Sequence, residues 1–404
     1  MDVLHGNLNR SMEPFRETPL GRPSPRVSLV IPVRNEEGSI GALIDSLRRQ
    51  TRPPDEVVLV DGGSIDSTVI LARTLTAGDP RYRVLEAGDA TPGRGRNVGI
   101  VAAQHDWIAL TDAGIELEPT WLERLVEAVE RDPCVKAVYG NCEPVTNSFF
   151  TRCAALAYVP AKQPRPDGWM RGPFIASSLV HRDVWQVVGG FPDLRASEDL
   201  IFMERIRDRG FKLGWAPTAT VHWHIRPTLA QTFRRFVQYS KHNVWAGRQR
   251  YWHYGVARIY FAALPFVVLA AVSSPWWLGV LASGAMARVA KSLWTKREGR
   301  GLAWLLNPVQ FVAVGAILIA IDAATFAGWV LAATTRPQDA SVLETAGQTE
   351  CRRSTDGVFR LLLGRSFRTV AVEHHSLKES SKPDAAPAGC ESPRIKLSDR
   401  DGVE

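Results

Sequence analysis

Two acidic residues follow apolar, strand-like segments in the first half of this 404-residue chain. Asp61 comes after Glu56-Val-Val-Leu-Val60, and Asp112 comes after Trp107-Ile-Ala-Leu-Thr111. Ligands of open α/β sheets collect outside the carboxyl ends of the strands, so both acids stand where a metal ion or a phosphate would bind. An ordinary loop Asp is the alternative for Asp112 taken alone, and the neighbouring motifs favour the binding site.

Basic and glycine residues accompany these acids. Arg34 and Glu36 follow the first strand-like segment, and the glycine-rich turn Thr91-Pro-Gly-Arg-Gly-Arg-Asn97 contains Arg94 and Arg96. Such a mixture suits a nucleotide, because acids accept hydrogen bonds from a base edge and ribose hydroxyls, whereas guanidinium groups match diphosphate oxygens. The two glycines of the turn would let the backbone approach that diphosphate. A solvated loop or an RNA-binding patch is the alternative, but neither explains the acids opposite the turn.

Strand-like and helical segments alternate between residues 27 and 225. Short apolar runs predict strands at 27–32, 56–60, 84–85, 107–111, 135–140, 174–180, 212–216 and 220–222. Helical spacing and capping residues predict helices at 40–47, 69–75, 91–104, 120–129, 182–188 and 198–210. This order predicts an α/β domain with a mostly parallel sheet and helices on both faces. Thr120 and Glu123 predict a capping box, and 152–171 is expected to be an irregular, mobile loop.

The composition changes twice after residue 225. Residues 226–258 form a basic aromatic segment with seven Lys/Arg and no acid, which predicts a juxtamembrane position. Residues 259–287 then carry no charge, and 302–333 carry only Asp322. A bilayer span needs about 20 apolar residues, so 259–333 predicts two or three transmembrane helices, the first run being one long helix or a hairpin broken at Ser273-Ser-Pro275. A buried pair of soluble helices is the alternative.

Net charge, cysteine content and the two ends of the chain indicate the partners and the cellular location of the protein. The net charge of +7 suits an anionic partner without choosing between nucleic acid, a membrane surface and a phosphorylated small molecule. Five cysteines include no CxxC pair, which argues against a zinc site. Residues 1–26 are polar with no apolar core of a signal peptide, and basic residues flank the spans, so the domain at 27–225 is expected on the cytoplasmic side. Residues 1–26 and most of 334–404 are expected to be disordered.

Five motifs in order resemble the family 2 glycosyltransferases of the GT-A fold, in which a nucleotide-diphospho-sugar donates its sugar. They are Val-Ile-Pro-Val-Arg-Asn-Glu-Glu at 30–37, Val-Asp-Gly-Gly-Ser-x-Asp-x-Thr at 60–68, Gly-Arg-Asn at 95–97, Thr-Asp-Ala-Gly at 111–114, and Gly-Gly-Phe followed by Glu-Asp at 189–199. The resemblance runs from about Val27 to Arg226. It implies a nucleotide-sugar site made by Pro32, Arg34, Glu36, Asp61, Gly63, Arg94, Arg96 and Asp112, in which Pro32, Arg34 and Glu36 border the base and ribose, Asp61 holds the base and Arg96 lies near the diphosphate.

The resemblance also implies a divalent cation, Mg²⁺ or Mn²⁺, held against the diphosphate by a D-x-D motif. Asp112 matches the first acid, but Gly114 stands where the last is expected. Because a hard ion often takes one or two carboxylates together with substrate phosphates and water, Asp112 is the expected metal ligand, with Glu116 and His222 as further candidates.

Asp199 matches the family's catalytic base, which implies a single displacement with inversion. A helix-start acid that merely interacts with the helix dipole is the alternative. Glu198, Trp223 and Arg226 are expected on the acceptor side. The Q-x-x-R-W motif of polymerising synthases is matched only in part by Gln231-Thr-Phe-Arg-Arg235, because Arg235 stands where Trp is expected. We therefore expect transfer of one sugar to a lipid-linked or other membrane-proximal acceptor at the inner membrane, in cell-envelope or exopolysaccharide synthesis, and no nucleic-acid partner.

Two rival functions remain. A sugar-phosphate nucleotidyltransferase would need a G-x-G-x-R loop after the first strand, where Arg34-Asn-Glu-Glu37 stands instead. A non-catalytic membrane scaffold that retains the fold is the second, because the last acid of D-x-D is missing.

Overall fold

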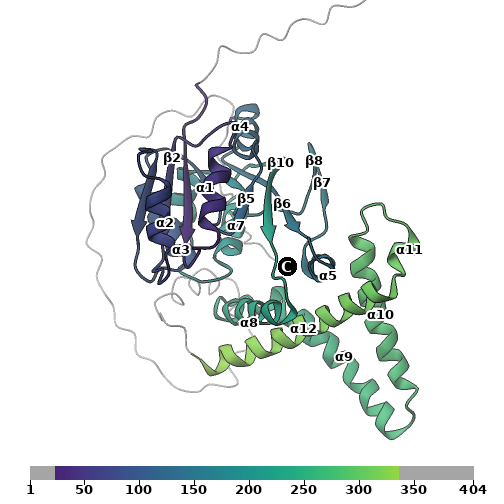
Figure 1. Cartoon of the computed structure of the whole chain (residues 1–404). Coiled ribbons are helices and arrows are strands. Elements are labelled where there is room, and N and C mark those ends of the chain that lie inside the picture. Colours follow the sequence, from purple (N-terminus) through teal and green to yellow (C-terminus); the bar gives the residue numbers. More distant parts are fainter. Residues whose placement is uncertain (1–22, 336–404) are drawn as a thin grey trace, which may run out of the picture.

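The computed structural model describes residues 23–335. A twisted sheet with flanking helices forms one part, and helices α8 to α12 form the other, from which the hairpin of α9 and α10 projects away from the sheet (Figure 1). The strands are β1 Val27–Val33, β2 Glu56–Asp61, β3 Tyr82–Glu86, β4 Trp107–Leu110, β5 Ile115–Leu117, β6 Ala137–Val145, β7 Gln163–Arg165, β8 Gly168–Met170, β9 Ser178–His181 and β10 Leu213–His224. The helices of the sheet domain are α1 Ile40–Arg48, α2 Thr68–Leu75, α3 Pro92–Ala102, α4 Trp121–Arg131, α5 Phe149–Tyr158, α6 Arg182–Val188 and α7 Glu198–Asp208.

The main sheet has the strand order β3-β2-β1-β4-β9-β6-β10-β5. Strands β3, β2, β1 and β4 are mutually parallel, and β6 pairs in parallel with β10. Only β9 and β5 run antiparallel to their neighbours in this sheet. The predicted α/β domain with a mostly parallel sheet is therefore confirmed.

Alternating side chains on the strands build a core on each face of the sheet. On β1, Leu29 and Ile31 face the core that contains α1, α2 and α4, whereas Val30 faces the core that contains α3, α6 and α7. The same alternation places Leu59 of β2 in the first core and Val60 in the second. Successive side chains of a strand point to opposite faces of the sheet, and here both faces are buried. Each strand segment is therefore a continuous apolar run in the sequence.

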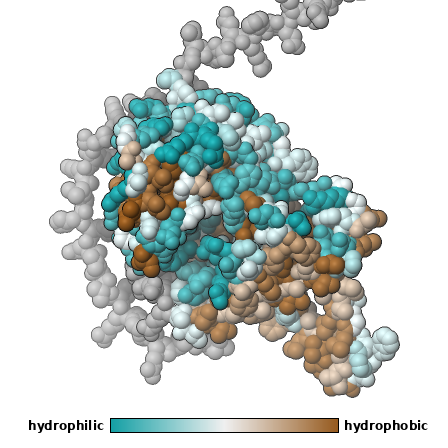
Figure 2. Space-filling view, in the orientation of Figure 1, coloured by the Kyte–Doolittle hydropathy of each residue, from teal (hydrophilic) through white to brown (hydrophobic). Residues whose placement is uncertain are grey.

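The helices after residue 225 are α8 Leu229–Trp245, the short η1 Gln249–Tyr251, α9 His253–Val272, α10 Trp277–Thr295, α11 Leu302–Leu305 and α12 Pro308–Thr334. The break between α9 and α10 falls at 273–276, so the first uncharged run forms the hairpin and not one long helix. By length and composition, α9 and α12 are candidate membrane spans. Apolar residues gather on the hairpin surface (Figure 2). Asp322 of α12, 1% exposed in its side chain, accepts hydrogen bonds from Arg288 of α10 and Tyr260 of α9 and so joins the three helices.

Three expectations about local structure need correction. The segment 152–171 is not irregular, because it contains most of α5 and the hairpin of β7 and β8. Thr120 makes no side-chain cap at α4, because its φ of −95° and ψ of 7° are not the extended conformation of a capping residue, and the Glu123 side chain accepts a hydrogen bond from Thr51. The two closing strands at 212–216 and 220–222 are one strand, β10, with an irregular register between Ala216 and Thr220. The expected disordered segments, apart from 23–26 and 334–335, lie outside the described residues.

The packing of α3 on the sheet gives the first testable prediction. A Cβ on Gly99 would lie 2.3 Å from Cγ1 of Val30, whereas a Cβ on Gly41 of α1 would meet nothing closer than 4.0 Å. Both changes to Ala gain helix propensity of about 1 kcal/mol, but Gly99→Ala adds overpacking that costs about 1–3 kcal/mol. We expect thermal unfolding of the full chain in detergent to show a lower melting temperature for Gly99→Ala than for Gly41→Ala. Equal melting temperatures would contradict this account of the α3 interface.

Candidate active site

The functional residues leave the sheet at one edge. Val33 is paired with Asp61 in the register of β1 and β2, and β4 runs parallel beside β1 on the other side. The turns after these three strands therefore begin at the same edge, which brings Arg34, Asp61 and Asp112 to it. Strands β6 and β10 run in the same direction, so their carboxyl ends contribute to this edge as well.

Arg96 links two acids from distant parts of the chain. It lies on α3 and is 3% exposed. Its Nη2 donates to Oδ1 of Asp112 at 2.6 Å, and its Nη1 donates to Oε1 of Glu198 at 2.8 Å. Arg96 is predicted to lie near a diphosphate, and in the structure both of its terminal nitrogens bind the protein's own carboxylates. The reason is the close contact of α3 with the start of α7, described next.

Glycine makes this contact possible. A Cβ on Gly93 would lie 2.1 Å from the carbonyl oxygen of Pro192 and 3.2 Å from Cβ of Glu198. A Cβ on Gly95 would lie 3.3 Å from Cβ of Pro32. The glycines of the turn thus admit the protein's own β1 and the segment before α7. The approach of a diphosphate to this turn stays a prediction.

The acids around Arg96 influence one another's ionisation. Burial raises the pKa of the Glu198 carboxyl to about 7, and the charge of Asp199 adds to this shift, although Arg96 opposes it. Burial likewise raises the pKa of Asp199, with Arg96 opposing and Asp112 adding to the shift. Oε2 of Glu198 and Nε of Arg96 are buried without a hydrogen-bond partner. Three carboxyl groups thus face one guanidinium group, and a further cation would stabilise their ionised forms.

Helix α7 holds the two acids of the Glu-Asp motif in its first turn. Its N-cap residue, Ser197, has a φ of 71° and is buried, a conformation that costs about 1–3 kcal/mol for a residue other than glycine. The helix is held again further along, where Nη2 of Arg248 donates to Oε1 of Glu204 at 2.9 Å and Nη1 binds the other carboxylate oxygen. Contacts from α3 and from the segment after α8 therefore fix the position of Asp199.

The residues predicted on the nucleotide side lie in turns that are held by their own hydrogen bonds. The Asp61 carboxylate is buried and accepts hydrogen bonds from the backbone amides of Gly63 and Ser64, at 3.0 and 3.1 Å. Gly63 has a φ of +82°, which favours glycine. Glu36 accepts a hydrogen bond from the hydroxyl of Ser39.

The arginines of these turns differ in their partners. Arg34 pairs with Asp89, which also binds Arg195 at 2.8 Å. Arg94 is exposed and has no acidic partner among residues 23–335. It is thus available to an anion at this edge, whereas Arg34 would have to exchange Asp89 for one.

The proposed metal ligands do not form one cluster. Glu116 pairs with His224 at 2.8 Å, and His222 pairs with Glu118. Within the described part of the chain, no group of three or more His, Cys, Asp or Glu side chains could hold a metal ion. The cause is the antiparallel pairing of β5 with β10, in which His222 lies opposite Glu116 in the backbone register while its ring reaches Glu118. Asp112 remains, with a 40% exposed side chain and with Oδ2 unbonded within residues 23–335.

The three residues expected on the acceptor side lie apart. Glu198 is buried and pairs with Arg96 at 2.8 Å, so its carboxylate is not exposed to an acceptor. The ring of Trp223 packs against Tyr158, with centroids 6.3 Å apart. Arg226 is exposed beside α8.

Two further polar groups were missed by the sequence analysis. Asn97 accepts hydrogen bonds from Nε1 of Trp185 and from the amide of Phe191, both at 2.9 Å, and so holds the segment before α7. Its place in Gly-Arg-Asn was the available signal. Arg171 binds Glu143 at the end of β6 and Glu298 in the α10–α11 connection. No sequence pattern indicated Arg171, because its segment was interpreted as a loop.

The family described as Glycosyl transferase family 2 matches residues 28–171. This range contains Asp61, Arg96 and Asp112 but ends before α7.

The chain is similar to named relatives over different lengths. It is 34% identical to the putative glycosyltransferase EpsH of Bacillus subtilis over 26% of this chain and 30% of that one. The match to the uncharacterized glycosyltransferase EpsJ of the same organism covers 31% of EpsJ, so the chain spans about a third of the length of these two relatives. It is 27% identical to the succinoglycan biosynthesis protein ExoA of Rhizobium meliloti over 64% of this chain and 82% of ExoA.

The fold has a known counterpart. The mannosyltransferase PcManGT of Pyrobaculum calidifontis, solved with GDP-Man and Mn²⁺, superposes with a TM-score of 0.51 and 21% identity, over 75% of this chain and 87% of that one. At this identity the likeness concerns the fold, which is GT-A. With the motifs, the family match and this fold in agreement, the chain contains a glycosyltransferase family 2 domain at residues 28–171.

Proposed function

We propose that the chain is an inverting glycosyltransferase that moves one sugar from a nucleotide-diphospho-sugar to a lipid-linked or other membrane-proximal acceptor. The observation that carries the proposal is the Arg96 bridge, which sets Asp112 from the strand edge and Asp199 from α7 around one guanidinium group. Family membership gives the reaction class, and the similarity to a succinoglycan biosynthesis protein supports a role in cell-envelope or exopolysaccharide synthesis.

Each residue has a defined part in this reaction. The nucleotide lies over the turns after β1 and β2, beside Asp61 and Arg34, with Arg94 free to bind phosphate oxygens. Asp199, when ionised, accepts the proton of the acceptor hydroxyl as its oxygen attacks the anomeric carbon, and the bond to the nucleoside diphosphate breaks on the opposite face of the sugar. Attack from that face inverts the anomeric configuration.

A divalent cation fits the charges of this site. Oδ2 of Asp112 has no hydrogen-bond partner within residues 23–335, and Asp112, Glu198 and Asp199 surround the single guanidinium group of Arg96, so Asp112 together with donor phosphates would hold Mg²⁺ or Mn²⁺. When bound, the ion would neutralise charge on the departing diphosphate. The Mn²⁺ in the PcManGT complex supports this part of the proposal.

Location follows from the helices. We propose that α9 and α12 span the inner membrane, that α10 returns the chain across it between them, and that the sheet domain lies on the cytoplasmic side. The lengths and apolar composition of these helices support a bilayer position. Basic residues before α9 and in the α10–α11 connection support the cytoplasmic orientation.

Asp199→Asn tests the chemistry. A panel of UDP- and GDP-sugars is first screened by thermal shift, since a donor that binds the folded chain raises its melting temperature. With the selected donor and a membrane extract as acceptor source, we expect Asp199→Asn to lower the rate of nucleotide release by about 100- to 10,000-fold, because the base is lost. Asp208→Asn, an exposed site at the end of the same helix, should leave the rate within about twofold of the wild type, as exposed substitutions usually do.

Equal rates for Asp199→Asn and the wild type would remove Asp199 from the chemistry. No turnover with any donor would favour the non-catalytic scaffold.

Gly114→Asp tests the cation. A Cβ at this position would meet nothing within 4 Å, so an acid fits there. Adding it should lower the Mn²⁺ concentration for half-maximal activity about tenfold, the order of change that one contact near a metal makes. Gly114→Asn, which has the same shape without the charge, should change this concentration little. Identical metal dependence in both variants would show that no cation binds beside this turn.

A further inference from the structure

Asp89 binds two arginines that come from distant segments of the chain. Its Oδ1 accepts a hydrogen bond from Arg34, 55 positions before it, and another from Nη2 of Arg195, 106 positions after it, the latter at 2.8 Å. The side chain of Asp89 is 72% exposed, and ion pairs at such positions contribute little to stability. Stability therefore gives little reason to bring two guanidinium groups to this one carboxylate.

The position of Asp89 is beside the turn that carries Asp61. Strands β2 and β3 end together, because Asp61 is paired with Glu86 in their register. The backbone next to Asp89 contacts the turn after β2, since a Cβ on Gly62 would lie 2.7 Å from the carbonyl oxygen of Ala90. The two guanidinium groups are therefore at the part of the sheet edge where the proposed function places the nucleotide.

Arg195 belongs to the segment that leads into α7. It comes four residues before Asp199 and two residues after Asp193. The carboxylate of Asp193 accepts a hydrogen bond from the hydroxyl of Thr91, the N-cap residue of α3. An anion on Arg195 would thus be bound by the same segment that carries the proposed base, and this segment is already fixed against α3.

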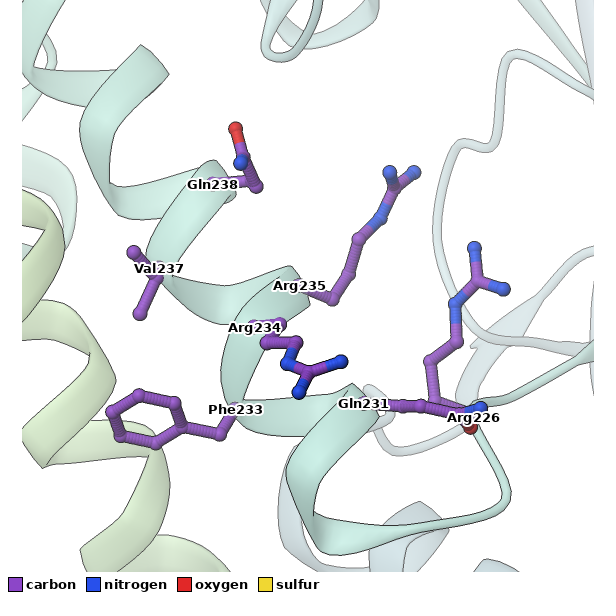
Figure 3. A pocket seen from close by; sticks show the side chains of 7 residues that line it. All are labelled: Arg226, Gln231, Phe233, Arg234, Arg235, Val237 and Gln238. Carbon is purple, nitrogen blue, oxygen red and sulfur yellow. The ribbon is translucent and has the colours of Figure 1, made fainter. Parts of the chain in front are cut away.

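The surroundings of Arg195 on the side of α8 are basic. Burial lowers the pKa of His242 on α8 to about 4, and the charges of Lys241 and Arg195 add to this shift. Figure 3 shows a further guanidinium group of this helix, that of Arg235, extending away from it. Asp89 is the only acidic partner of Arg195 within residues 23–335. An anion at Arg195 would reduce the repulsion among these positive charges.

A phosphate group and a carboxylate offer guanidinium groups the same charge-assisted hydrogen bonds, and the planar forks of arginine fit both. We propose that Asp89 holds the place of a donor phosphate: when the nucleotide-diphospho-sugar binds, a phosphate replaces Asp89 on Arg34 and Arg195. Arg195 is then a donor-binding residue, and Asp89 is an internal competitor of the donor. The proposal rests on the proposed function for the chemical class of the donor.

The test is a calorimetric titration of UDP and of GDP, with Mn²⁺ in the buffer, into the full chain in nanodiscs of zwitterionic lipid. The nucleoside diphosphate that binds the wild type more tightly serves as the probe. Arg195→Gln should weaken its binding roughly 10- to 100-fold, as the loss of a hydrogen bond to a charged group does. Asp89→Asn should tighten binding about two- to fivefold, because the competing charge is lost.

The matched controls are Arg73→Gln and Glu86→Gln. These two residues form another exposed ion pair, at 2.5 Å, and Glu86 ends β3 three residues before Asp89. Each control removes one charge of the same sign as its counterpart and should change the probe affinity less than about twofold. They separate a direct contact with the probe from the general effect of a charge near the sheet edge.

The opposite signs expected for the two substitutions distinguish this exchange from a structural contact. If Asp89 and Arg195 only held the segment before α7 in place, both substitutions would break the same ion pair and weaken binding alike. Arg195→Lys should give an intermediate affinity, because Lys keeps the charge but lacks the planar fork. If Arg195→Gln melts below the wild type, Arg195→Lys decides, and an affinity equal to that of the wild type counts against a contact with phosphate.

Three results would overturn the proposal. They are unchanged probe affinity in Arg195→Gln, unchanged or weaker affinity in Asp89→Asn, and changes of the same size in the controls. Should the wild type bind the probe while any of these results is found, the nucleotide site of the proposed function stands without Arg195. Should the wild type bind neither UDP nor GDP, the proposed donor site fails and this proposal fails with it.

Discussion

The ion bridge at Arg96 is the contact on which the geometry of the site depends. It joins α3, the turn after β4 and the start of α7, three segments that belong to different parts of the chain. Burying a guanidinium group is costly unless carboxylates compensate it, and losing one partner leaves the other charge buried and unpaired. The bridge therefore makes the positions of Asp112 and Asp199 interdependent, and it explains why α3 contains glycines at its contacts with β1 and with the segment before α7.

The same bridge leaves a surplus of negative charge at the strand edge. Arg96 forms ion pairs with two carboxylates, and the third, Asp199, lies close enough for its charge to raise the pKa of Glu198. A site in this state attracts cations and resists further anions. A diphosphate donor would enter it more readily with a divalent ion, which gives the single acid at the D-x-D position a physical partner in place of the missing second one.

Much of the sheet domain could be predicted because its signals are local. Apolar runs such as Val27–Val33 and the acids that follow them are visible in sequence, and parallel strands bring their ends to one edge. The partners of the polar residues could not be predicted in this way. Arg96 contacts Glu198, 102 positions away, because α3 packs against the start of α7. His222 contacts Glu118 because β5 pairs antiparallel with β10. Helix α5 was missed because its short apolar set stands next to prolines.

The ion pair of Arg248 and Glu204 connects α7 to the chain that leads into α9. Arg248 belongs to the chain just before α9, and Glu204 lies one and a half turns after Asp199 on α7. If α9 is embedded in lipid and Asp199 is the proton acceptor, as proposed, this side-chain pair fixes the height of the Asp199 carboxylate above the head-group plane. A hydroxyl presented from the bilayer must then reach that height, so the pair would select acceptors by how far their sugars extend into water.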